Sequence, residues 1–235
     1  MRKDTLLIYL ALLLCMPLTA QPDEDAWYYG FRAGATYGAI GDIPVTIIPA
    51  TFSAETYDAV THPTPGFTGG IMLYHRFDES RFAIQPAIDF STGGGSMAYA
   101  DVNDLEYTID LAYQYATLGT DLKVYPIGGL HAALGVELAF NVASDRIRYR
   151  SNMPELGPDL QIQESLREVL SGGTDVRLLA GIGYDFPFGL TVDLRYRRGL
   201  TDAVETLANG FGFIENPNKS TGLRATVGWL IEFPN

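Results

Sequence analysis

After residue 20, the sequence lacks cysteine, clustered histidines and long apolar stretches. The only cysteine is Cys15, so the rest of the chain has neither a disulfide framework nor a thiol site. The histidines, His62, His75 and His131, lie in separate segments without clustered carboxylates, which predicts no metal site. No later segment approaches the roughly 18 to 20 apolar residues of a membrane-spanning helix. Any passage through a membrane would therefore have to use strands.

Basic residues are also scarce, and motifs for catalysis are missing. The chain has 16 Lys and Arg against 28 Asp and Glu, a net charge of −12, which argues against a nucleic-acid partner. The glycine run 93–95 has no lysine or helix after it, unlike a phosphate-binding loop. No histidine is placed for the Ser-His-acid set of a membrane lipid hydrolase. The sequence predicts no catalytic residue, no cofactor and no enzymatic activity.

The amino terminus has the layout of a secretory signal peptide. Residues 2–3 are basic, residues 6–16 form an apolar run, and Ala20 is a small residue at a plausible cleavage point. That order of segments is typical of export signals. We expect residues 1–20 to be cleaved and residues 21–235 to form one domain. A buried amino-terminal helix and a lipid-modified cysteine are the alternatives.

The rest of the chain alternates apolar and polar residues with a period of two. Such alternation over nine or so residues indicates strands and not helices. Eight segments show it: 27–39, 67–77, 82–90, 107–124, 130–142, 175–185, 190–197 and 222–233. Long connections are expected at 41–65, 91–105, 144–173 and 203–219, and tight turns at 78–81, 127–129 and 187–189. This arrangement predicts an all-β fold, an eight-stranded antiparallel up-and-down transmembrane β-barrel with periplasmic turns and four extracellular loops.

The fourth of these segments changes phase. Apolar residues occupy odd positions from Tyr107 to Tyr115 and then even positions from Leu118 to Val124. A β-bulge near residues 116–117 would produce such a slip. An ordinary break between two strands is the alternative.

Composition indicates which face lies inside. A soluble barrel with the faces reversed is the alternative to a membrane barrel, but the polar face combines many glycines with charges of both signs. A narrow lumen filled by side chains explains that combination. The predicted lumen ion-pair network is Arg32, Asp89, Asp110, Glu137, Asp175, Arg177, Asp193, Arg195, Arg197 and Arg224. The apolar face gathers aromatic residues at strand ends, Trp27 and Trp229 towards the turns and Tyr37 and Tyr107 towards the loops, as two membrane interfaces require.

Two features of the third long connection stand out. Arg146, Arg148 and Arg150 continue the outward parity of the preceding strand, where they are candidates to bind lipopolysaccharide phosphates. A solvated strand extension is the alternative. Ile162, Leu166, Val169 and Leu170 have helical spacing, which predicts a short amphipathic helix over the barrel.

The chain resembles the PorT-type outer-membrane β-barrel family of gram-negative bacteria. The segment 194–202 looks like that family's Arg-Tyr…Gly-Leu-Thr motif, and residues 31–34 and 122–125 match more weakly. The resemblance covers essentially residues 27–233, with Gly119 standing where members often carry proline. It implies an outer-membrane barrel. One founding member is tied to protein secretion, but most members have no assigned activity.

These observations favour a non-enzymatic outer-membrane barrel that acts as a surface scaffold or a binding module. The alternatives are an accessory subunit of an outer-membrane secretion system and, further down, a small channel. The expected partners are outer-membrane lipid, lipopolysaccharide and envelope or secretion-system proteins.

Overall fold

The computed structural model describes residues 26–41, 60–77, 80–100, 106–152, 159–206 and 218–233. The expected signal peptide lies outside these residues, as do parts of all four expected long connections. Within them, no helix is long and apolar enough to span a membrane.

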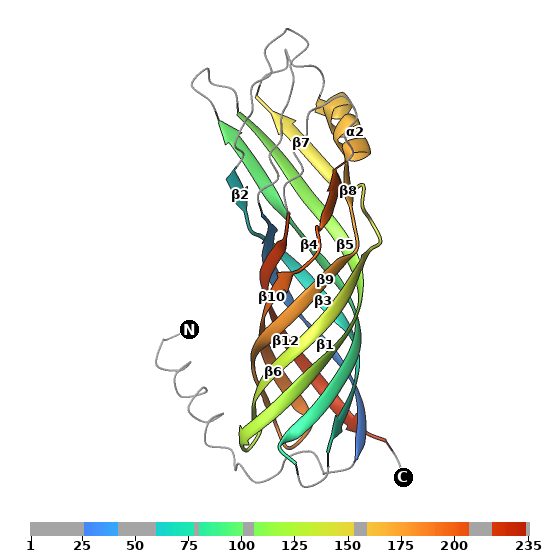
Figure 1. Ribbon diagram of the computed structural model, residues 1–235, viewed down its shortest axis with the longest axis vertical. Helices are drawn as coiled ribbons and strands as arrows, with labels where there is room; N and C mark the ends of the chain where they lie inside the picture. Colours follow the sequence, from blue (N-terminus) through green and yellow to red (C-terminus); the bar gives the residue numbers. More distant parts are fainter. Residues whose placement is uncertain are drawn as a thin grey trace, which may run out of the picture.

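The described residues form one barrel with additions at its upper end in Figure 1. The elements are β1 (Trp27–Ile40), β2 (Val60–His62), β3 (Thr64–Arg76), β4 (Phe82–Ala100), β5 (Glu106–Ile127), β6 (Leu130–Asn141), β7 (Ile147–Ser151), α2 (Asp159–Val169), β8 (Leu170–Gly172), β9 (Asp175–Asp185), β10 (Leu190–Gly199), β11 (Val204–Thr206) and β12 (Ser220–Glu232). Eight strands close a ring in the order β4-β3-β1-β12-β10-β9-β6-β5, because β5 also pairs with β4. All these pairings are antiparallel, and the predicted eight-stranded barrel is confirmed.

The two faces of the strands differ in the way a membrane barrel requires. Phe31 is 58% exposed and Leu134 is 67% exposed, whereas Arg195 is 2% exposed. Apolar side chains therefore cover the outside and charged side chains fill the inside, the reverse of a soluble barrel. The soluble alternative is wrong.

Short turns join the strands at one end of the ring. Gly128 lies in the β5–β6 turn with φ 53° and Gly189 in the β9–β10 turn with φ 94°, a backbone conformation that L side chains rarely adopt. The first residue of β1 and the last of β12 lie at this same end, opposite α2 and β7 (Figure 1).

The connections at the other end are more structured than predicted. Within the expected connection 91–105, residues 91–100 are strand and not loop, because β4 runs to Ala100 and pairs without a break with β5, which begins at Glu106. Beyond the ring, β2 pairs with β4 and β7 pairs with β5. The predicted amphipathic helix is present as α2. The long β4–β5 hairpin therefore carries the sheet beyond the barrel (Figure 1).

The predicted phase slip in the fourth strand is wrong in both of its versions. β5 is continuous from Glu106 to Ile127, and its odd-numbered side chains face inward along its whole length, from Tyr107 to Tyr125. The only irregularity in its pairing with β6 lies between Val124 and Ile127. The sequence pattern changes because the interior changes from apolar to charged along one unbroken strand.

The upper interior is an apolar core, which we call the apolar cap. Its buried members are Ile40, Met97, Tyr107, Ile109, Leu111, Tyr113, Tyr115, Ala139, Ile147, Tyr149, Leu166, Leu170, Ala203 and Val204. Leu166 comes from α2, where Ile162 also packs against this cluster. Tyr107 is therefore buried at 2% exposure and does not belong to the outer aromatic band, which corrects its predicted position.

Candidate functional site: the charged lumen

Below the apolar cap, the barrel interior holds buried ionisable side chains, which we call the charged lumen. Each comes from an inward position of a ring strand, alternating with an outward apolar residue, as Asp193, Arg195 and Arg197 do on β10. Its members are Arg32, Asp89, Asp121, Lys123, His131, Glu137, Asp175, Arg177, Asp185, Asp193, Arg195, Arg197 and Arg224. All are less than a tenth exposed, so their charges depend on one another and not on bulk water.

Arg32 and Asp89 form a two-point ion pair across the lumen. Arg32 Nε donates to Asp89 Oδ1 at 2.9 Å, and Arg32 Nη2 donates to Asp89 Oδ2 at 2.5 Å. Asp121 lies 3.7 Å from Arg32 Nη1, and Arg224 Nη1 lies 3.7 Å from Asp89. The paired guanidinium and carboxylate geometry is the strongest form of such a contact.

Glu137 joins two further arginines. Its Oε2 accepts from Arg224 Nη1 at 2.8 Å, and its Oε1 accepts from Arg177 Nη1 at 3.2 Å. Arg177 Nε also donates to Asp175 Oδ2 at 2.6 Å. The Arg177 guanidinium lies 4.4 Å from the centre of the Tyr115 ring, a cation–π contact at the border with the apolar cap.

A third group of charges lies nearer the turns. Arg195 Nη2 lies 2.5 Å from Asp193 Oδ1, which is 2.9 Å from His131 Nε2. Lys123 Nζ donates to Asp185 Oδ2 at 3.0 Å. The hydroxyl of Tyr125 also donates to Asp185. These contacts form a second set of charge pairs in the lumen, beside the set that Arg32, Arg177 and Arg224 make with their acids.

The structure places the predicted network residues inside the barrel with one exception. Asp110 lies on the outer face, where its carboxylate accepts from Arg150 Nη2 at 2.9 Å and from Ser96 Oγ at 2.7 Å. The reason is the absent phase slip, since even positions of β5 point outward throughout. The exposed Arg146, Arg148 and Arg150 lie above the apolar band, and Arg150 pairs with Asp110.

Sequence reasoning missed Asp121, Lys123 and His131, and left Asp185 out of the network although it lay on the predicted polar face. Strand parity was the available signal: Asp121 and Lys123 flank Leu122, which is 45% exposed, and His131 follows the exposed Leu130. Among the described residues, no group of three or more His, Cys, Asp and Glu side chains is arranged to hold a metal ion.

The arrangement of these side chains stabilises and fills the lumen. Pairing of buried charges offsets the cost of removing each from water, and side chains of both signs occupy the cross-section of a barrel whose eight strands leave room for little else. The interior is therefore filled along the charged lumen and again by the apolar cap.

Comparisons with known proteins place the chain. The family model for the outer membrane protein beta-barrel domain matches residues 8–229. Among solved structures, Neisserial surface protein A is similar at 14% identity, covering 86% of this chain and 96% of that one, with a TM-score of 0.39. Outer membrane protein OprG from Pseudomonas aeruginosa is similar at 8% identity, covering 89% and 98%, with a TM-score of 0.40. No curated protein matches the sequence. The extent of the family match shows that this chain, an outer-membrane β-barrel protein, belongs to the outer membrane protein beta-barrel domain family.

Proposed function

We propose that the protein is a non-enzymatic surface barrel whose lumen passes no solute and which acts through its upper end as a scaffold or a binding module. The observation that carries this proposal is the filled interior. Ion pairs such as Arg32–Asp89 and Glu137–Arg224 cross the lumen, and the apolar cap lies above them. Opening a path would separate buried charges from their partners, at a cost of several kcal/mol for each.

Planar bilayers test the closed lumen. The purified wild-type protein should conduct no steady current, because its cross-section is occupied by paired side chains. A Glu137→Ala and Arg177→Ala double variant, which empties part of the lumen, serves as the matched positive control for insertion. Reproducible open-channel steps from the wild type would overturn the proposal and favour the small channel.

We further propose that Arg146 and Arg148 bind phosphates of lipopolysaccharide. Both are exposed above the outward apolar band, and guanidinium groups bind phosphate through paired hydrogen bonds. Replacing both by Gln should weaken co-sedimentation with lipopolysaccharide vesicles, more so at low salt. The exposed Arg81, at the turn end, supplies the control variant Arg81→Gln. Equal binding by all three proteins would contradict this assignment.

A PorT-type role as an accessory subunit of a secretion system is the second candidate. It rests on the likeness of residues 194–202 to that family's motif. We also propose that residues 1–20 are a signal peptide that is cleaved on export and that the protein comes from a gram-negative bacterium. Purification in mild detergent from native cells tests the accessory role, because a subunit should bring stoichiometric envelope proteins with it. A protein that elutes without partners at native expression supports the scaffold.

A further inference from the structure

Arg197 is the exception in the charged lumen. It is 7% exposed, yet its guanidinium donates no hydrogen bond and has no carboxylate oxygen within 4.0 Å among the described residues. The charges that act on it most include two arginines, Arg177 and Arg224, against one acid, Glu137. Burying a cation without a partner lowers the stability of the fold. A bound anion beside Arg197 would offset that loss.

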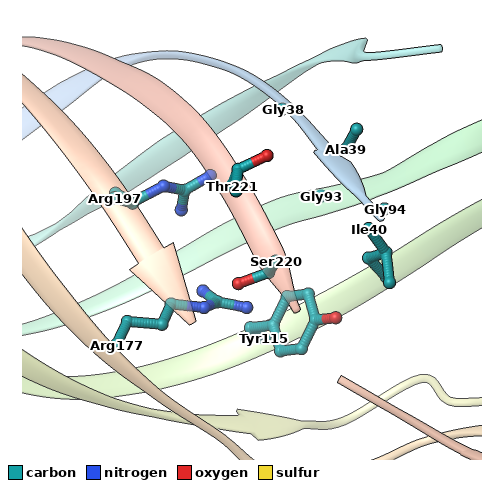
Figure 2. A pocket seen from close by; sticks show the side chains of 10 residues that line it. All are labelled: Gly38, Ala39, Ile40, Gly93, Gly94, Tyr115, Arg177, Arg197, Ser220 and Thr221. Carbon is teal, nitrogen blue, oxygen red and sulfur yellow. The ribbon is translucent and has the colours of Figure 1, made fainter. Parts of the chain in front are cut away.

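A cavity lies in front of this arginine. Its volume is about 20 Å³, it has a mouth open to solvent, and its lining includes Arg177, Arg197, Tyr115, Ser220, Gly93 and Gly94. Figure 2 shows both arginine side chains extending into this space towards Ser220 and Thr221. It lies at the border between the charged lumen and the apolar cap, where Tyr115 belongs to both the cavity wall and the cap.

The room in the cavity exists because an inward position of β4 lacks a side chain. A Cβ atom at Gly93 would meet only the Tyr115 ring, at 3.7 Å. The other inward glycines nearby are different: a Cβ at Gly38 would lie 2.5 Å from the carbonyl oxygen of Thr221, and one at Gly222 would lie 2.7 Å from that of Tyr37. Gly93 is therefore the position from which a side chain can fill the cavity without displacing backbone.

Nearby acids are already engaged. Asp175 Oδ2 accepts from both Arg177 Nε at 2.6 Å and Ser220 Oγ at 2.5 Å, and both oxygens of Glu137 accept from Arg177 and Arg224. The Arg177 guanidinium is held by these acids and by the Tyr115 ring, so the free donors of Arg197 lie beside a second, fixed guanidinium that lines the same small space. We propose that this cavity is a binding site for one small free oxyanion of the phosphate class, held between Arg197 and Arg177. Planar guanidinium groups bind such oxyanions with pairs of parallel N–H donors.

The proposal is tested on the folded full-length barrel in a detergent without phosphate. Sodium phosphate is compared with sodium chloride at equal ionic strength, so that screening is the same in both. Phosphate at about ten times its Kd should lower the unfolding equilibrium constant about tenfold, and calorimetric titration should give one site per barrel. Equal stabilisation by both salts would overturn the proposal, since it would reduce the effect to screening.

Three variants assign the effect to the cavity. Arg197→Met should abolish the phosphate response and, without phosphate, should leave the barrel at least as stable, because a buried unpaired charge is gone. Gly93→Gln keeps Arg197 but fills the cavity, and should also abolish the response. Arg198→Met removes the neighbouring arginine on the exposed face of β10 and should respond like the wild type. A phosphate response that persists in Arg197→Met or in Gly93→Gln would refute the site, as would loss of the response in Arg198→Met alone.

Discussion

Strands β4 and β5 run through both the charged lumen and the apolar cap, and the interiors of these two regions are opposite in character. Inward side chains of β4 and β5 include Asp89, Asp121 and Lys123 in the lumen, and Met97 and Ile109 in the cap. The outward side chains reverse as well. Leu122 is exposed where the ring has its apolar band, whereas polar residues such as Asp110 lie outside the cap.

This reversal shows how surroundings decide a strand's two faces. Where lipid covers the outside, outward residues must be apolar and charge is placed within. Where water covers the outside, the ordinary arrangement of a soluble sheet returns, with an apolar interior. β5 runs from the part of the sheet with an apolar interior to the part with a charged interior, and its odd-numbered side chains face inward in both.

The largest expected effect comes from breaking an ion pair in the lumen. Glu137→Met leaves Arg177 and Arg224 without their shared carboxylate, so the free energy of unfolding should fall by roughly 3–5 kcal/mol. Urea unfolding in lipid vesicles, read by the heat-sensitive gel mobility of the folded barrel, measures it. The exposed Glu106 gives the control Glu106→Met. Similar losses in the two variants would show that the lumen pairs contribute little.

A substitution that leaves an unfilled space in the apolar cap should lower the free energy of unfolding somewhat less, and its effect should be confined to the cap. Ile109 is fully buried, and Ile109→Ala should lower local stability by about 2–4 kcal/mol through lost burial and an unfilled cavity. Hydrogen exchange should speed up in β7 and α2, whose side chains share this core, while amides of β9 and β10 keep their protection. Uniform loss of protection around the ring would mean that cap and lumen unfold as one unit.

The smallest effects come from one chemical change made in both regions. Tyr125→Phe removes a hydroxyl that donates to Asp185, and should cost about 1.5–3 kcal/mol as a bond to a charged group. Tyr113→Phe removes a buried hydroxyl without a hydrogen-bond partner in the described part of the chain, and should change stability by less than about 1 kcal/mol, towards the stable side. Equal costs from the two variants in urea unfolding would remove the contrast between lumen and cap.

Much of the fold and part of the site follow from the sequence alone. A period of two over segments such as 175–185 and 222–233 specifies strands, and the glycine-rich charged face specifies a narrow lumen. Strand parity also placed Arg32, Glu137 and Arg195 inside. It fails for Asp110, because the pattern predicts that the apolar odd positions from Tyr107 onward face lipid, whereas they face the cap.

The sequence by itself determined the barrel, its strand number and the apolar band, because lipid imposes one pattern on every strand that crosses it. Only the tertiary structure decided where along β5 that pattern stops, since an apolar face is equally compatible with lipid and with a core. It also decided which charges meet: Glu137 and Arg224 are 87 positions apart in the chain, and the register of intervening strands brings them together. Among the residues that the structure describes, the same register leaves Arg197 without a carboxylate oxygen within 4.0 Å. Pairing across a closed ring depends on all of its strands at once, and no local pattern encodes it.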